Sequence, residues 1–156
     1  MIASTPHPGS DATVRDLLAL ALEYHRAAKL LLAQGRKGAR LSRAPFRLAA
    51  IHAIELYLSA LLRHSGCSPT EIRAFGHSLA PRAEAAMGRG LRLRKRTLGH
   101  LTKVDQTREY LVSRYGPRQI DQISELNRLT STLAEIAGKT AQLVGGSSSY
   151  SKSHAA

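Results

Sequence analysis

The amino-acid sequence predicts an all-α fold, an antiparallel up-and-down helical bundle of four to five helices. Apolar residues recur every three to four positions through most of the chain, which is the period of one face of an α-helix. No segment alternates apolar and polar residues in the way that half-buried strands do. Glycine and proline separate the periodic segments, and the short loops between them favour antiparallel neighbours.

Length and composition agree with one helical domain. A chain of 156 residues with 43% hydrophobic residues can bury a core of its own. Aromatic residues make up only 4% and tryptophan is absent, so leucine, alanine, isoleucine and valine must fill that core. We divide the chain into a flexible leader (1–10), a single bundle domain (11–144) and a disordered tail (145–156) without apolar periodicity.

The first helix is expected to begin after Ser10 or Asp11, because either side chain can accept a hydrogen bond from an unpaired backbone N–H. It ends at about Gln34, before a glycine. A basic connection, residues 35–42, leads to the second helix, in which Pro45 suits the first turn. The second helix ends at about His64 and is apolar nearly all round, as expected of a central helix.

The second half of the chain supplies the remaining helices. Ser68 begins a short turn with the spacing of a capping box, and a third main helix follows over 77–87 or 78–87. A fourth helix is expected from Arg94 or Thr97 to Tyr115, where Gly-Pro stops it. A fifth is expected over 119–144.

The net charge of +12 favours anionic partners such as RNA, DNA, nucleotides or acidic proteins. The alternative is that a chain rich in arginine and alanine reflects a GC-rich genome. The candidate binding surface consists of two basic stretches. They are Arg36, Lys37, Arg40, Arg43 and Arg47 in the first, and Arg92, Arg94, Lys95 and Arg96 in the second.

Three other residues are candidate ligand-binding residues. Glu55 stands among apolar residues, so its carboxylate needs a partner, either a ligand in a pocket or a cation on a neighbouring helix. His77 stands at a helix start, where it either stabilises the fold or helps to bind a phosphate. Arg73 is close enough in sequence to assist it.

We expect a cytoplasmic protein that needs no cofactor or metal. The single cysteine, Cys67, excludes an internal disulfide and suits a reducing compartment. The first residues lack the pattern of a signal peptide, and charged residues interrupt the apolar segment 17–32, so no membrane span is expected. No spacing of His, Cys, Asp or Glu predicts a metal site, and no glycine-rich phosphate loop is present.

The order of motifs over 11–115 resembles the HEPN superfamily, the helical domain named for higher eukaryotes and prokaryotes and for nucleotide binding. The features that carry the resemblance are YHRAAKLLL from Tyr24, AIELYLSALL from Ala53, GHSL from Gly76 with a later Gly-Leu, and Arg-Tyr at 114–115. The resemblance implies a helical bundle that binds nucleotide or RNA, commonly as a homodimer. It also implies a nucleotidyltransferase or an antitoxin as a further partner.

Many members of this family resemble metal-independent ribonucleases, in which four to six residues separate an arginine from a following histidine. Such chemistry needs a histidine that exchanges protons and an arginine that steadies the phosphate. Two pairs here have that spacing, Arg47 with His52 and Arg94 with His100, and about two are expected by chance. We therefore favour a non-catalytic domain. There are two alternatives. One is a ribonuclease that uses Arg94 and His100, such as the toxin of a toxin–antitoxin pair, and the other is a homodimeric interaction module.

Overall fold

The structure is a computed structural model that describes residues 3–153, with side chains described as far as Gly146. Seven α-helices, one short 3-10 helix and no strand lie within these residues, so the predicted all-α class is confirmed. The elements are α1 (Val14–Gln34), η1 (Arg40–Arg43), α2 (Ala44–His64), α3 (Pro69–Arg73), α4 (Leu79–Met87), α5 (Lys95–Gln106), α6 (Glu109–Tyr115) and α7 (Leu126–Ser153).

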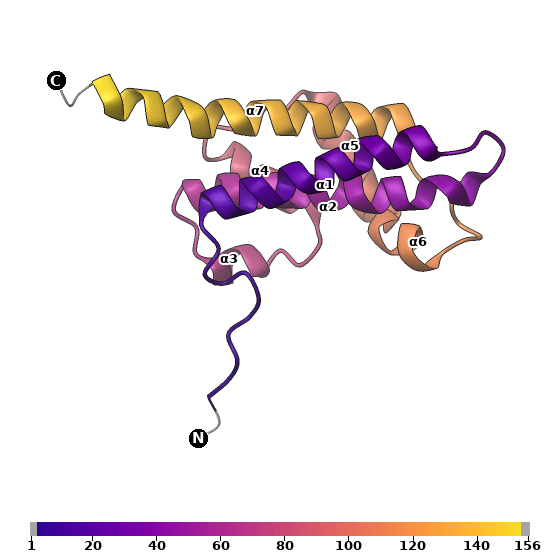
Figure 1. Cartoon of the computed structure of the whole chain (residues 1–156), viewed down its shortest axis with the longest axis horizontal. Helices are drawn as coiled ribbons and strands as arrows, with labels where there is room; N and C mark the ends of the chain where they lie inside the picture. The colour runs from indigo at the N-terminus through magenta and orange to yellow at the C-terminus, as the bar shows by residue number, and fades with distance from the viewer. Residues whose placement is uncertain (1–2, 154–156) are drawn as a thin grey trace.

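Helix α2 is the centre of the bundle. It contacts α1, α3, α4, α6 and α7, and Figure 1 shows α1 and α7 lying along it. Ile54, Leu58 and Leu62 are fully buried, and so are Ala50 and Ala53, where neighbouring helices pack close to its backbone. The apolar character of this helix on all sides is therefore explained by its position in the core.

The segment Arg40–His64 is long and apolar enough to cross a membrane, with a mean hydropathy of 1.3 in its most apolar part. That part is 72% buried inside the bundle, as in the core helix of a soluble protein. Burial by the other helices thus accounts for the apolar sequence.

Helices α1 and α2 end where the glycine signals predict, and only the start of α1 differs from the prediction. Helix α1 begins at Val14 rather than directly after Ser10 or Asp11, because Thr13 is the residue that caps it. Thr13 Oγ1 accepts from the Asp16 N–H at 3.1 Å, and Asp16 Oδ2 accepts from the Thr13 N–H at 2.9 Å. Helix α1 ends at Gln34 and α2 at His64, as predicted.

The segment expected to form one fourth helix forms two, α5 and α6. The chain breaks at Arg108, whose φ of 52° lies in the left-handed region that residues with a side chain seldom adopt. The break redirects the chain so that Glu109, the first residue of α6, is fully buried. The contact of Glu109 with Arg47, 62 residues away in the sequence, therefore breaks the helix that the local apolar period predicts.

The last helix is also shifted relative to the prediction. Helix α7 begins at Leu126 instead of Gln119, because residues 117–125 form a loop in which Ile120 and Ser124 are buried. It runs to Ser153 and so includes part of the segment 145–156, for which we expected disorder. Residues 154–156, like residues 1 and 2 of the leader, lie outside the described part.

Candidate anion-binding site

The predicted basic residues of the α1–α2 connection line one hollow of about 330 Å³, here called the basic pocket. Arg36, Arg40, Arg43 and Arg47 form one wall. The other wall is formed by six residues of 120–126, namely Ile120, Asp121, Ile123, Ser124, Glu125 and Leu126. Lys37 is exposed beside the basic pocket. Four of the five predicted residues of the first basic stretch therefore meet at one site.

Local hydrogen bonds fold the connection so that its arginines share a side. Ser42 Oγ accepts from the Arg36 N–H at 2.8 Å and donates to the Ala39 carbonyl at 2.5 Å. Gly38 has a φ of 79°, which glycine adopts without strain. At Gly35 a side-chain carbon would lie only 2.9 Å from Arg43 Cγ, so glycine allows the Arg43 side chain to pack there.

Two of the four arginines that line the basic pocket lack a carboxylate partner among the described residues. Arg40 pairs with Asp121, and Arg47 pairs with the buried Glu109. Over residues 3–146 no ion pair involves the other two arginines of this wall, Arg36 and Arg43, or the adjacent Lys37. These side chains are available to an anion, and two of them are arginines, which can bind a phosphate through two parallel N–H donors.

A second hollow adjoins the basic pocket and extends its positive surface. It shares Arg40, Ile120 and Asp121 with the basic pocket and adds Pro117 and Arg118. Sequence reasoning did not select Arg118, because the segment around it was expected to begin a helix. The only available signal was its place in a Gly-Pro-Arg sequence, which is typical of loops.

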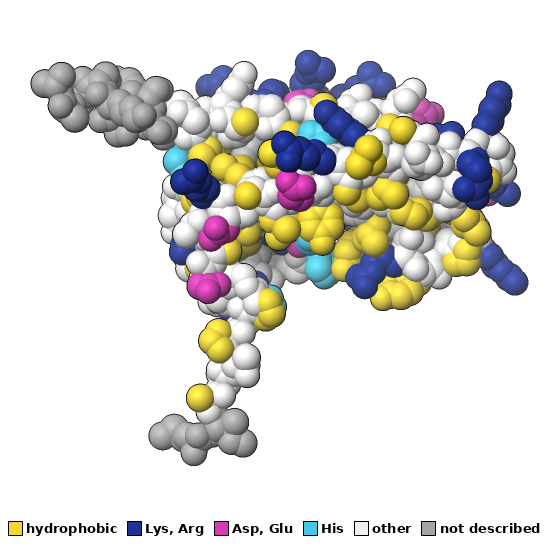
Figure 2. Space-filling model, viewed as in Figure 1, with side chains coloured by type: hydrophobic (Ala, Val, Ile, Leu, Met, Phe, Trp, Pro, Cys, Tyr) yellow, Lys and Arg dark blue, Asp and Glu magenta, His cyan; other side chains and the backbone are white. Residues whose placement is uncertain are grey.

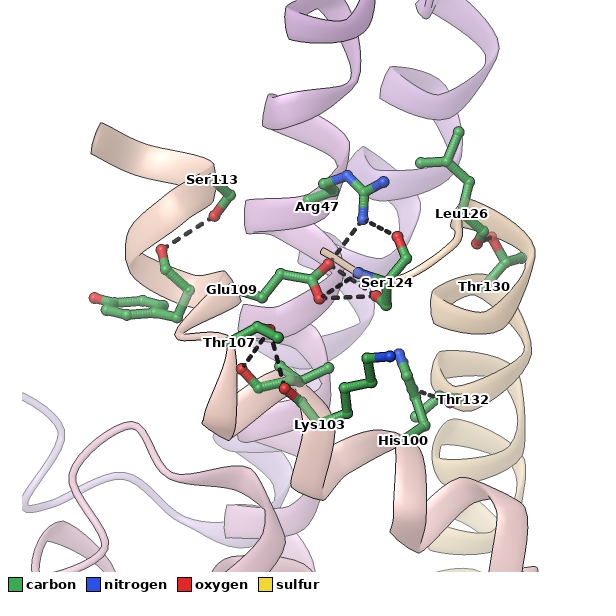
Figure 3. Close-up of polar contacts among 12 residues, drawn as sticks. Arg47, His100, Lys103, Thr107, Glu109, Ser113, Ser124, Leu126, Thr130 and Thr132 are labelled. Carbon is green, nitrogen blue, oxygen red and sulfur yellow. Dashed lines mark hydrogen bonds and ion pairs between the residues drawn. The ribbon is translucent and has the colours of Figure 1, made fainter. Parts of the chain in front are cut away.

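The back of the basic pocket is closed by a buried polar network, shown in Figure 3. Arg47 Nη1 donates to Glu109 Oε1 at 2.8 Å and to the Ser124 carbonyl at 2.6 Å. Ser124 donates to the same carboxylate through its N–H at 3.2 Å and through its hydroxyl at 2.8 and 2.9 Å. Arg47 thus joins α2, α6 and the loop before α7, and its side chain is committed to the fold.

Figure 3 also shows His100, one of the two weak catalytic candidates, against α7. His100 Nδ1 lies 2.7 Å from Thr132 Oγ1, and the residue is buried. Burial, aided by the charges of Arg128, Arg47 and Lys103, lowers the pKa of His100 to about 4. At neutral pH the ring is therefore uncharged and enclosed.

The other catalytic candidate, Arg94, has different partners. Its side chain is 80% exposed and lies 3.9 Å from Glu135, whose carboxylate also accepts from the Arg94 N–H at 2.9 Å. Thr97 donates to the same carboxylate at 2.6 Å. Arg94 and His100 are therefore bound to separate residues of α7. Likewise Arg47 enters the core, whereas His52 packs edge-on against Tyr24.

The second basic stretch lies at the start of α5. Arg92, Lys95 and Arg96 are exposed, and the Arg92 carbonyl accepts from Lys139 Nζ at 2.6 Å. These residues line neither of the two hollows described above. They form a solvated surface against α7 instead of a concave site.

Glu55 and His77 do lie together, as their candidacy as one ligand site requires. His77 Nδ1 is 3.3 Å from Glu55 Oε2. Arg82 Nη2 is 3.6 Å from Glu55 Oε1, and Arg82 also donates to Ser59 Oγ and to the Gly76 carbonyl, each at 2.7 Å. The carboxylate is thus satisfied within the protein.

The arginine of this cluster is Arg82, which sequence reasoning missed. Arg73, the expected partner, donates instead to Ser10 Oγ at 3.0 Å and to Thr70 Oγ1 at 3.3 Å. The available signal for Arg82 was a basic residue on the otherwise apolar face of α4, between Leu79 and Ala86. A buried cation at such a position needs an anion from another helix.

Among the described residues no group of three or more His, Cys, Asp and Glu side chains could hold a metal ion. No protein-family model, no curated protein and no solved structure matches the chain.

Proposed function

We propose that this protein is a non-catalytic, HEPN-like helical bundle that binds the phosphates of RNA or of a nucleotide in the basic pocket. The observation that carries the proposal is the convergence of Arg36, Lys37 and Arg43 beside one hollow, with no carboxylate partner among the described side chains. Guanidinium groups match phosphate oxygens in geometry as well as charge. The net charge of +12 attracts such a ligand from a distance.

The size of the basic pocket is consistent with a phosphate-bearing ligand. Its volume of about 330 Å³ is at the lower end of the range of roughly 300–1,000 Å³ that small-molecule sites occupy. The adjoining hollow with Arg118 offers a place for a second phosphate along a strand. Both features favour a nucleotide or a short length of RNA.

The environment of the histidine supports leaving catalysis out of the proposal. A general acid–base group works best with a pKa near the operating pH and must reach the reacting atoms. His100 is buried, its pKa is lowered to about 4, and it bonds to Thr132. Purified protein should therefore leave RNA intact without added metal. Cleavage that His100→Ala abolishes would establish the ribonuclease instead.

The test of phosphate binding is a titration of fluorescein-labelled RNA followed by anisotropy. Affinity should fall steeply between roughly 50 and 200 mM salt, because phosphate contacts release counterions. The double variant Arg36→Ala/Lys37→Ala should weaken binding about tenfold or more at the lower salt concentration. A mononucleotide used as a competitor would distinguish a nucleotide site from an RNA site.

The matched control is Arg15→Ala/Arg26→Ala, which changes the net charge equally with exposed residues of α1. It should retain most of the affinity. Equal weakening by the two double variants would mean that net charge alone attracts RNA, and no measurable affinity would remove the proposal.

The homodimer and the nucleotidyltransferase or antitoxin partner belong to the same proposal through the resemblance alone. We expect light scattering at micromolar concentration to give the mass of a dimer, with α7 as the candidate interface. A monomeric mass would remove this part and leave phosphate binding unaffected.

A further inference from the structure

A column of flat side chains lies on the surface of α6 and the turn before α4. The ring of His77 stacks on that of Tyr110, with centroids 4.3 Å apart and planes 22° from parallel. The guanidinium carbon of Arg114 lies 5.1 Å from the centroids of both Tyr110 and Tyr115. We call these four residues the stacking column.

The outer end of the stacking column is open to solvent. Tyr115 is 70% exposed, and Leu30 is the only other large hydrophobic residue of the described part that is exposed to this degree. His77, at the other end, has a side chain that is 58% exposed. An exposed aromatic ring held beside a guanidinium presents a face on which a further planar group can stack.

The stacking column is bordered by a hollow and by one further arginine. His77 and Tyr110 line this hollow together with Ser78, Arg108 and Leu111. Arg108 is exposed, and over the described side chains it has no ion pair. Its left-handed backbone places it at the break between α5 and α6. Strained residues that persist in a fold are frequent at binding sites.

The stacking column leads to the basic pocket. Tyr115 ends α6 two residues before Pro117, which with Arg118 and Arg40 lines the hollow adjoining that pocket. Figure 1 shows α6 at the same end of the bundle as the α1–α2 connection. In Figure 2 hydrophobic side chains gather over this end, with Lys and Arg side chains around them. Planar groups and cations thus follow one another along one surface.

We propose that the stacking column binds the bases of a single-stranded RNA whose phosphates occupy the basic pocket. The inference rests on the proposed function and specifies its substrate as an unpaired strand instead of a mononucleotide or a duplex. Bases of a duplex are stacked on each other, whereas those of a single strand are free to stack on aromatic side chains. Stacking tolerates every base, so sequence preference should be weak.

The test compares a ligand with bases and a ligand without them. The probes are a fluorescein-labelled oligoadenylate of about ten nucleotides, followed by anisotropy, and inorganic polyphosphate as its competitor. Tyr115→Ala should weaken oligoadenylate binding at least about fivefold and leave the affinity for polyphosphate unchanged. Tyr115→Phe, which keeps the ring, should bind within about twofold of the wild type.

Leu30→Ala is the matched control, because Leu30 on α1 is also 70% exposed. It should bind both probes as the wild type does. Tyrosine fluorescence should be quenched by oligoadenylate and not by polyphosphate, which reports the stacking directly.

The outcomes separate this inference from the proposed function. If Arg36→Ala/Lys37→Ala weakens oligoadenylate binding and Tyr115→Ala does not, phosphate binding stands and the stacking column is wrong. Equal loss of both probes in Tyr115→Ala also overturns it, because the effect would then be independent of the bases. No binding of either probe by the wild type overturns both proposals.

Discussion

Arg47 and Glu109 are both buried in the core, where each is the ion-pair partner of the other. The side chain of Glu109 is fully buried and that of Arg47 is 9% exposed, so water solvates neither. Ser124 supplies the remaining donors to the carboxylate and an acceptor for the guanidinium. Taking one partner away leaves the other as an uncompensated buried charge.

We expect Arg47→Met to lower the free energy of unfolding by roughly 3–5 kcal/mol, measured by urea denaturation. The control is Arg40→Met, which removes the exposed Arg40–Asp121 pair and should cost at most about 1 kcal/mol. Equal losses in the two variants would mean that the buried Arg47–Glu109 pair matters no more for stability than the exposed Arg40–Asp121 pair.

His100 makes stability depend on pH. Its pKa in the folded protein is about 4, below the ordinary value of 6.5, so the unfolded chain binds the proton more readily. The contribution of His100 to the free energy of unfolding is therefore fully present above pH 6.5 and is lost as the pH falls through 4. This contribution is on the order of 3 kcal/mol. His25 and His52, whose pKa values burial also lowers, act in the same direction.

Two measurements isolate the part due to His100. The ring signals of His100 in an NMR titration should stay those of the neutral form until the pH approaches 4. The loss of stability between pH 7 and 4 should be smaller in His100→Gln, because the other histidines remain in both proteins. A titration near pH 6.5 would contradict the buried environment.

At the scale of the element, the start of α4 is fixed by a side chain from another helix. Asp105 on α5 accepts from the N–H groups of Leu79 and Ala80 at 2.9 and 2.8 Å. Ser78, the residue in the capping position, makes no capping hydrogen bond with its side chain. The carboxylate thus replaces a local cap and ties α4 to α5.

Asp105→Ala should therefore destabilise the protein by roughly 2 kcal/mol in urea denaturation, because two donors at a helix start lose their acceptor. The control is Glu84→Ala, an exposed carboxylate on α4, which should change stability by no more than about 0.5 kcal/mol. A small effect of Asp105→Ala would mean that water replaces the carboxylate at no cost.

How far the sequence predicts these elements depends on what ends each of them. Glycine and proline are local signals, and the ends of α1 and α2 that they predict are where the structure has them. The break at Arg108 and the late start of α7 arise from the burial of Glu109 and Ser124 against Arg47. Those contacts join residues that are distant in the sequence, so no local pattern predicts them.

The same distinction applies to the candidate site. A run of arginines in a glycine-containing connection pointed to the basic pocket, since the residues are close in sequence. The wall opposite them, over 120–126, comes from the far end of the chain. Charge and spacing alone could not pair the two walls, nor could they pair Glu55 with Arg82 on another helix.

At the scale of the whole molecule, the excess of positive charge destabilises the folded state. With 23 basic and 11 acidic residues the surface repels itself, and salt screens this repulsion. The midpoint of thermal unfolding should rise when sodium chloride is added from roughly 10 to 200 mM. Sucrose is the control for effects of solute without charge, and a midpoint that falls with sodium chloride would contradict net repulsion.

The network behind the basic pocket has a consequence for the order of folding. Arg47 and Ser124 are 77 residues apart in the chain, so the loop between them must close before the second wall exists. A chain still emerging from the ribosome carries the cations of the first wall long before it can build the second. Phosphate binding as we propose it for this pocket would therefore begin only after residues 120–126 have been synthesised and have packed against Arg47.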